Sequence, residues 1–248
     1  MLDGNPWTIA GVAAAMMIGG FCKGASGISL ALIAVSLAAI FVDIPTAVAL
    51  MTVPVLIANI WQVGSNEFKG DAWRTYWPLY VAILPGVAIG AKVLTTVDPL
   101  LISGVVGVLV VLFAILIYSQ PDWYLPPEKA RRIGVPVGFT GGLVAGISGF
   151  LPPVLMYMVA LKLPKERFVG AIGIAYLTAV VALMLFLAGY KFLTWELVLW
   201  SAAAALPMFG GQLIGHFTRR LIAETPFRLM VLTLMLVSGA NLIRKALV

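Results

Sequence analysis

A glycine-rich motif of nine residues occurs twice in this chain, and each copy lies inside strongly apolar sequence. The first copy reads GGFCKGASG over residues 19–27, and the second reads GGLVAGISG over residues 141–149. The same offset of 122 residues aligns Trp73 with Trp195, far beyond the motif. Repetition over this length indicates two homologous halves, and internal repeats fix the architecture of a chain. We therefore predict a first membrane repeat, a cytoplasmic linker and a second membrane repeat, over residues 1–120, 121–134 and 135–248.

The apolar content of the chain excludes a soluble domain. Hydrophobic residues make up 62% of the 248 residues, charged residues make up 10%, and the mean hydropathy is +1.06. A soluble domain of this length has no core large enough to bury so much apolar surface. We therefore predict an integral membrane protein. The net charge of +6 comes from basic residues in short loops. This distribution indicates that the basic residues orient the chain in the membrane, and it does not suggest binding to nucleic acid.

Ten apolar runs follow one another, five in each half. The run over residues 150–161 is only long enough for about 18 Å of helix, whereas a bilayer core is ~30 Å thick. Pro152 and Pro153 at its start resist a helix interior. Each half is therefore predicted to begin with a helical hairpin broken at Gly-Ser-Gly, followed by three spanning helices. The fold class is an all-α membrane protein with eight to ten membrane helices, counting hairpin arms. The runs cover residues 6–21, 28–42, 44–63, 76–93, 100–118, 135–147, 150–161, 168–187, 197–216 and 227–242.

Loop charge predicts the orientation of the chain. With loops 64–74, 120–132, 162–167 and 217–228 in the cytoplasm, that side holds eleven Lys or Arg and the other side holds four. The positive-inside rule then places both termini outside. The two hairpins would enter from opposite sides, so the halves form an inverted-topology repeat, which is typical of transporters.

The two hairpin breaks are the predicted substrate site. A broken helix in a bilayer leaves backbone groups that need partners, and the N-termini of half-helices attract anions. Glycines let a ligand approach the backbone, and serines offer hydroxyl donors. The alternative is that these small residues only allow close helix packing. The candidates are Gly24, Ser26, Gly27 and Ser29 in the first half, and Gly146, Ser148 and Gly149 in the second.

Lys23 is the one cation that this topology places inside the membrane, and such residues are functional candidates by default. It corresponds to Ala145 in the second half, so it breaks the internal symmetry and could attract an anion. Equally, it could end a 16-residue helix and extend its ammonium group to a headgroup or a nearby carbonyl. Cys22 is interpreted as a packing residue.

Polar residues on later runs could complete the site. Thr52, Asn59 and Gln62 roughly share one helical face, and Tyr176 lies at similar depth in the second half. They are candidates for lining the pocket, although hydrogen bonding between helices is the favoured role. Aromatic residues near the run ends are interpreted as interfacial belts without a substrate role. They are Tyr76, Trp77, Tyr80, Trp123, Tyr124, Trp195 and Trp200.

The sequence lacks the residue patterns of a proton relay, a zinc site and a nucleotide-binding loop. All ten carboxylates lie in loops or near run ends, so none is placed for a proton relay. No ligand cluster for zinc and no nucleotide-binding loop is visible. The sequence therefore predicts neither an enzyme nor a bound cofactor or metal.

The paired motifs resemble those of the TauE/SafE sulfite exporter family of bacterial and archaeal permeases. The matching segments are residues 19–30 with Pro45 and residues 141–153 with Pro164, and the resemblance covers essentially the whole chain. It implies a multi-pass permease of the prokaryotic cytoplasmic (inner) membrane that moves anions such as sulfite and sulfoacetate. The first motif has no proline equivalent to Pro152, which leaves the identity of the anion open.

The leading hypothesis is a secondary carrier, preferably an exporter, that binds sulfite or an organosulfonate between the two breaks and works by alternating access. A negative cell interior drives anion efflux by about 2.3 kcal/mol per charge per 100 mV, so export needs no proton carboxylate. Two rivals stay open: a channel-like anion uniporter, and a non-transporting membrane scaffold or assembly protein. The direction of transport, a coupling ion and homodimer formation also stay open.

Overall fold

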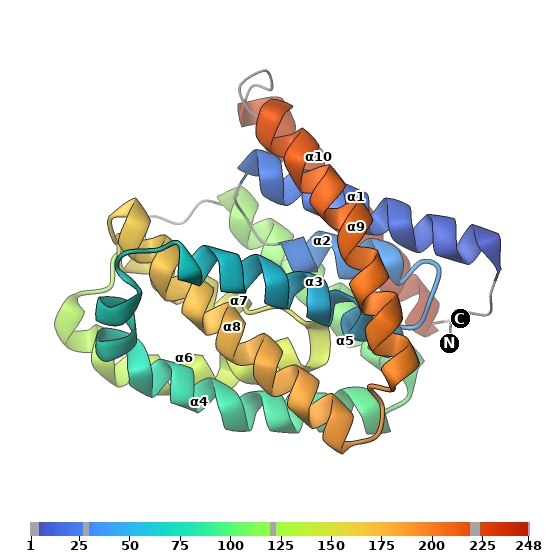
Figure 1. Cartoon of the computed structure of the whole chain (residues 1–248). Helices are drawn as coiled ribbons and strands as arrows, with labels where there is room; N and C mark the ends of the chain where they lie inside the picture. Colours follow the sequence, from blue (N-terminus) through green and yellow to red (C-terminus); the bar gives the residue numbers. More distant parts are fainter. Residues whose placement is uncertain (1–4, 27–29, 120–122, 219–223, 248) are drawn as a thin grey trace. The chain divides into compact units, whose positions relative to one another are not determined.

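The computed structural model describes residues 5–26, 30–119, 123–218 and 224–247, and every regular element in these ranges is a helix (Figure 1). Seven of the described helices contain stretches long and apolar enough to cross a bilayer, which confirms the predicted all-α membrane fold. These seven are α1, α3, α4, α5, α8, α9 and α10. The elements are α1 (Pro6–Ser26), α2 (Leu30–Ala38), α3 (Ile44–Gly64), α4 (Lys69–Thr96), α5 (Pro99–Ser119), α6 (Pro127–Ser148), α7 (Pro152–Ala160), α8 (Lys165–Gly189), α9 (Trp195–Thr218) and α10 (Glu224–Leu247).

A short helix stands second in each half of the chain. Both α2 and α7 have nine residues, which is about 14 Å of helix and less than half of a bilayer core of ~30 Å. The short arm predicted over residues 150–161 is thus present as α7. The corresponding run over residues 28–42 was predicted to be longer than the helix that it forms. Three long helices follow each short one, and the inverted orientation of the halves stays a prediction.

The first long helix of the second half begins earlier than the apolar run at residue 135. Residues 127–134 form the first two turns of α6, although their charged side chains were interpreted as part of a loop. Pro127 suits this start because the first helical position needs no backbone N–H donor. A helix can continue beyond the hydrocarbon into water. The apolar run therefore indicates which part of the helix lies in the bilayer, and it does not indicate where the helix begins.

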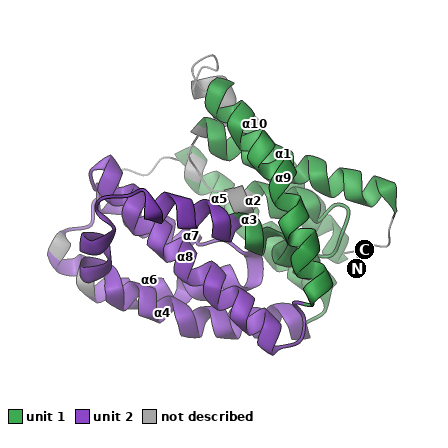
Figure 2. Ribbon diagram, viewed as in Figure 1, with its two compact units in different colours: residues 1–54, 97–120, 194–248 green, residues 55–96, 121–193 purple. Residues whose placement is uncertain are grey.

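The helices group into two compact units that do not coincide with the sequence halves (Figure 2). Unit 1 contains residues 1–54, 97–120 and 194–248, and unit 2 contains residues 55–96 and 121–193. The most extensive packing in unit 1 is between α1 and α9, and in unit 2 it is between α4 and α6. Each of these pairs joins a helix of the first half to a helix of the second half.

Glycines make the α1–α9 crossing in unit 1. A methyl group added at Gly20 would meet the carbonyl oxygen of Met208, and one added at Gly24 would meet that of Gln212. The relation is mutual, because a methyl group added at Gly211 on α9 would meet the backbone of α1. Helices that approach so closely gain dispersion contacts between their backbones, which is the usual role of small residues spaced by four in membranes.

The α4–α6 crossing in unit 2 has the same construction. A methyl group added at Gly86 on α4 would meet the carbonyl oxygen of Phe139. One added at Gly142 on α6 would meet that of Ile83. At both crossings the backbones of the two helices are therefore in direct contact at the glycines. Each crossing contains one copy of the repeated glycine motif.

α3 contains a proline in its interior, and a side chain of α9 forms hydrogen bonds with the backbone next to it. Pro54 has no N–H, so the carbonyl of Leu50 one turn earlier loses its helical donor. The buried hydroxyl of Ser201 donates to the Leu50 oxygen at 2.8 Å and accepts the N–H of Val53 at 3.1 Å. One side chain of the second half thus satisfies both backbone groups disturbed by the proline of the first half.

The end of each short helix is held by a hydrogen-bond donor from elsewhere in the chain. The Lys245 ammonium of α10 donates to the carbonyls of Ala39 and Ile40, just beyond α2, at 2.6 and 3.1 Å. The Leu125 N–H, which precedes α6, donates to the Ala160 carbonyl at the end of α7 at 2.8 Å. Both contacts satisfy carbonyls that a helix end leaves without donors.

Lys245→Met should lower the stability of unit 1 by about 1 kcal/mol, because a cation at a helix C-terminus and its hydrogen bonds are lost together. Hydrogen exchange of the α2 amides measures the change locally. Arg244→Met is the matched control, since Arg244 is exposed and, among the described residues, its guanidinium bonds only the side chain of Asn241. Equal exchange in the two variants would contradict a role of Lys245 at the end of α2.

Candidate functional site

The break of the second hairpin is narrower than predicted and covers residues 149–151. Gly149 has a φ of 75°, and its N–H donates to the Ala145 carbonyl at 2.8 Å. Glycine adopts this left-handed conformation without steric cost. Pro152 then opens α7, where its missing N–H is not needed. Phe150 and Leu151 of this turn are buried and Gly149 is half-buried, so the turn places the start of a short helix inside the protein.

Two candidates of the second half lie in α6 itself and not in the break. Ser148 is buried, and its hydroxyl donates to the Val144 carbonyl one turn earlier at 2.8 Å. Gly146 lies in the α4–α6 crossing, where an added methyl group would come within 2.7 Å of Gly90 Cα. The helical hydrogen bonds continue to Ser148, which is why the break starts only at Gly149. Both residues have structural contacts, and their role in binding stays a prediction.

The first hairpin differs from the prediction in the same way. α1 has 21 residues and continues to Ser26, so Lys23 and Gly24 are helical and Lys23 does not end a 16-residue helix. Gly24 is part of the α1–α9 crossing, and that packing extends the helix past the end of the apolar run. Lys23 is half-buried, and no described residue forms a hydrogen bond or ion pair with its ammonium group. Gly27 and Ser29 lie outside the described residues, as does the side chain of Ser26.

The polar residues of α3 form hydrogen bonds, but mostly within their own helix. Thr52 Oγ1 donates to the Ala49 carbonyl at 2.7 Å, and Asn59 Nδ2 donates to the Val55 carbonyl at 2.8 Å. Among the described residues, neither side chain forms the favoured hydrogen bond between helices. Gln62 does reach a second helix, because its Nε2 donates to the α8 carbonyl of residue 169 at 3.0 Å.

The described candidates are distributed over both units. In unit 1, Lys23 and Gly24 are neighbours on α1, and Thr52 lies on α3. In unit 2, Gly146, Ser148 and Gly149 share the end of α6, and half-buried Tyr176 lies on α8, which packs against α6 and α7. Asn59 is buried in the second part of α3.

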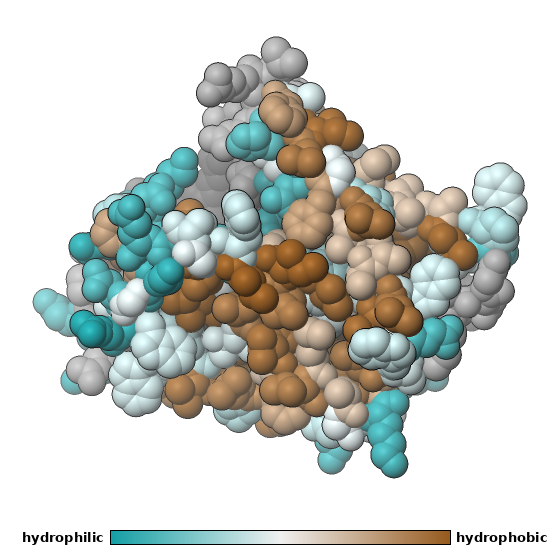
Figure 3. All heavy atoms as spheres, in the orientation of Figure 1, coloured by the Kyte–Doolittle hydropathy of each residue, from teal (hydrophilic) through white to brown (hydrophobic). Residues whose placement is uncertain are grey.

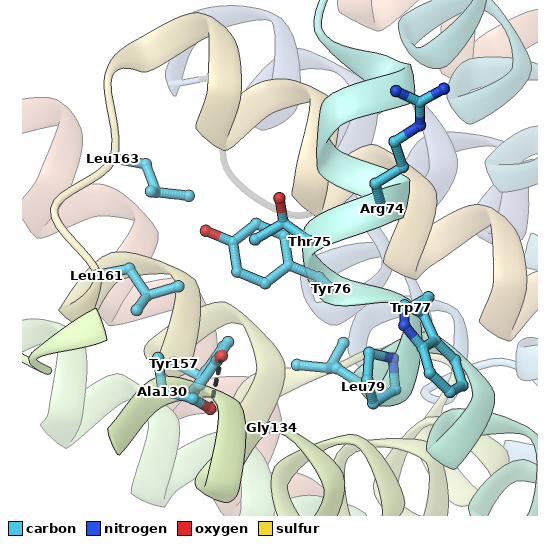
Figure 4. Close-up of a pocket in the computed structure, with 11 residues that line it drawn as sticks. Arg74, Thr75, Tyr76, Trp77, Leu79, Ala130, Gly134, Tyr157, Leu161 and Leu163 are labelled. Carbon is cyan, nitrogen blue, oxygen red and sulfur yellow. Dashed lines mark hydrogen bonds between the residues drawn. The ribbon is translucent and has the colours of Figure 1, made fainter. Parts of the chain in front are cut away.

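Unit 2 also contains a cavity that sequence reasoning missed (Figure 4). It has a volume of about 420 Å³ and lies where α4 begins, α6 begins and α7 ends. The Tyr76 side chain projects into the space between these helices in the close-up. The lining residues are Arg74, Thr75, Tyr76, Trp77, Pro78, Leu79, Ala130, Gly134, Tyr157, Leu161 and Leu163.

Two tyrosines, Tyr76 and Tyr157, line the cavity, and their hydroxyls differ in hydrogen bonding. Tyr157 donates to the Ala130 carbonyl at 3.0 Å, and the neighbouring Tyr80 donates to the Ala171 carbonyl at 3.1 Å. The hydroxyl of Tyr76 has no hydrogen-bond partner among the described residues. The spacing of Tyr76 and Tyr80 by four residues signals a shared helix face, but the opposite walls come from α6 and α7, which are distant in sequence.

No group of three His, Cys, Asp or Glu in the described part of the chain is arranged to hold a metal ion. The groups that could bind a ligand are instead hydrogen-bond donors and cations. They are hydroxyls, backbone amides, Lys23 in unit 1 and Arg74 in unit 2. Such groups bind anions without a resident cofactor.

The chain was compared with protein families, curated proteins and solved structures. Neither the curated proteins nor the solved structures gave a match. The sequence model described as sulfite exporter TauE/SafE matches residues 12–242, which include every spanning helix almost completely. This match agrees with the repeated motifs and the all-helical membrane architecture, and it covers far more than half of the chain. The protein therefore belongs to the sulfite exporter TauE/SafE family, whose members are membrane transporters of the anion-exporter type.

Proposed function

We propose that this protein is a secondary exporter of a small sulfur-containing anion, either sulfite or an organosulfonate such as sulfoacetate. The anion binds at the glycine-rich helix breaks, and the protein works by alternating access in the prokaryotic cytoplasmic membrane. The transporter class follows from the family, whereas the substrate, the site and the mechanism are proposals.

The observation that carries this proposal is the break at residues 149–151, in which Phe150 and Leu151 are buried. The nine-residue α7 starts there inside a membrane protein. The N-terminus of a half-helix carries a partial positive charge and points unpaired amides outward. Transporters use such ends to bind the anionic groups of substrates near the bilayer midplane. Ser148 lies immediately before this break, and Lys23 occupies the motif position corresponding to Ala145 in the other copy.

Export needs no carboxylate relay under this proposal. A membrane potential that is negative inside drives each negative charge outward with about 2.3 kcal/mol per 100 mV. All ten carboxylates lie in loops or near the ends of apolar runs, which fits a carrier powered by the charge of its own substrate.

Proteoliposomes with an imposed membrane potential test the proposal. We expect saturable uptake of labelled sulfite or sulfoacetate by the wild type, reduced at least fivefold by Lys23→Ala and by Ser148→Ala. Lys92→Ala controls for the loss of a positive charge, because Lys92 is exposed. Ser238→Ala controls for the loss of a buried serine, since its hydroxyl donates to the carbonyl of residue 234 as Ser148 does to residue 144.

Each alternative gives a different result. Uptake that does not saturate and shows no counterflow would support a channel-like uniporter. Folded protein that takes up no small anion would support a scaffold or assembly role. Saturable uptake that survives both substitutions would support a carrier but place its site away from Lys23 and Ser148.

A further inference from the structure

The cavity of unit 2 lies near the level where lipid headgroups meet water. Hydrophilic residues gather at the end of unit 2 where α4 and α8 begin, on the left of the space-filling view, and hydrophobic residues follow along the helices (Figure 3). Trp73 and Trp77, one turn apart at this end of α4, are each 50% exposed. Tryptophan prefers the membrane interface because its ring is apolar and its N–H is polar. The lining residue Trp77 therefore places the cavity at the level of the lipid headgroups.

The cavity has a cation and a hydroxyl with free donors among its lining residues. Arg74 is exposed and points outward in Figure 4, Tyr76 points inward, and neither the guanidinium nor the Tyr76 hydroxyl is hydrogen-bonded within the described ranges. Arg167 at the start of α8 lies close enough to Tyr76 to interact with it electrostatically. Guanidinium and hydroxyl groups together favour the oxygens of a phosphate or another oxyanion.

The size and the walls of the cavity distinguish between possible oxyanions. Its volume of about 420 Å³ compares with about 30 Å³ for one molecule of liquid water, so an ion of four or five heavy atoms would leave most of it empty. The walls also include the side chains of Leu79, Leu161 and Leu163. Such a space fits a ligand with an anionic head and an apolar remainder, because each part then meets a suitable surface.

From these observations we infer that the cavity binds the phosphate headgroup of an anionic phospholipid from the adjoining leaflet. The Tyr76 hydroxyl binds a phosphate oxygen, and the exposed Arg74 side chain, which points away from that hydroxyl in Figure 4, turns toward the phosphate when the lipid binds. The leucine wall contacts the start of an acyl chain. Basic pockets between membrane helices bind such headgroups by the same chemistry. This site is separate from the proposed anion site at the helix breaks, and neither proposal depends on the other.

Thermal unfolding of the purified full chain in mixed micelles tests this inference. Phosphatidylglycerol should raise the melting temperature of the wild type by about 5 °C relative to phosphatidylcholine at the same ionic strength, since a ligand that binds only the folded state stabilises it. The double variant Arg74→Gln/Tyr76→Phe should lose most of this rise. Arg132→Gln should keep it, because Arg132 is exposed on α6 but does not line the cavity.

A second variant tests the cavity without removing its charge. Gly134→Leu fills the space from α6, where a Cβ would lie an ordinary 3.5 Å from the Tyr157 hydroxyl, and leucine favours helix more than glycine. It should also lose the rise with phosphatidylglycerol, and it decides the question if the double variant does not fold.

Three results would overturn the assignment. An equal rise with phosphatidylcholine would remove the need for an anionic headgroup. An equal loss in Arg132→Gln would indicate attraction to the whole basic surface. A rise produced by sodium sulfite or inorganic phosphate in phosphatidylcholine micelles, and abolished by Arg74→Gln/Tyr76→Phe, would assign the cavity to a free oxyanion instead of a lipid.

Discussion

Gly211→Ala should destabilise the protein strongly, whereas Gly210→Ala should not, although the two glycines are adjacent on α9. A methyl group at Gly211 would meet the carbonyl oxygen of Met17 and lie 3.0 Å from the amide nitrogen of Phe21. Both are backbone atoms of α1, so they cannot move unless the helices separate. Overpacking of this kind costs about 1–3 kcal/mol or more. Nothing lies within 4 Å of a methyl group at Gly210, where alanine should be neutral or slightly stabilising.

Melting temperature and folded yield in detergent measure this difference. For a chain of this size, each kcal/mol corresponds to roughly 2–4 °C, so we expect Gly211→Ala to melt roughly 5–10 °C below Gly210→Ala. The α4–α6 crossing provides an independent pair, because Gly142 meets the backbone of Ile83 and Gly70 meets nothing within 4 Å. Equal melting temperatures within both pairs would show that the helices do not cross at these glycines.

Ser201→Ala should cost about 1–3 kcal/mol, the usual cost of leaving buried polar groups without partners. The substitution removes the donor to the Leu50 carbonyl and the acceptor for the Val53 N–H. Water cannot replace the hydroxyl there, because Ser201 is completely buried. Ser238→Ala is the control, since the Ser238 hydroxyl is also buried but bonds only to carbonyls of its own helix.

A double-mutant cycle identifies the cause of this cost. Pro54→Ala restores a backbone N–H that can donate to the Leu50 carbonyl. Removal of the Ser201 hydroxyl should then cost less by about 1 kcal/mol, because part of its role has been taken over. Chemical denaturation in detergent gives the four free energies of unfolding. An unchanged cost in the Pro54→Ala background would indicate that Ser201 contributes through packing and not through the proline-disturbed backbone.

The residues that were assigned to the substrate site illustrate how far the sequence could predict function. The glycine motif indicated correctly that something approaches the backbone closely at Gly24 and Gly146. In the structure the approaching group is a helix, since each glycine lies in a crossing with α9 or α4. Only Gly149, with its left-handed φ, lies in the described break itself. A glycine pattern indicates positions where the backbone needs space beside it. Either a ligand or another helix can occupy that space, so the pattern does not distinguish between them.

Local physical chemistry determined the membrane location, the order of long and short helices and the position of the second break. Apolar content forces the chain out of water, helix length is limited by bilayer thickness, and proline ends or starts helices wherever it occurs. These effects act over a few residues, so they are visible in the sequence. The family also became visible there, through motifs that lie at the start of each half.

The tertiary structure alone decided which helices pair. The α1–α9 and α4–α6 crossings join the two halves of the sequence, so compact units 1 and 2 each contain parts of both. The same pairing determined that Ser201 assists Pro54, that Lys245 holds the end of α2 and that Tyr76 faces a cavity. Apolar helices in lipid have many partners of similar hydrophobicity, and the choice among them depends on the close fit of surfaces that are distant in sequence.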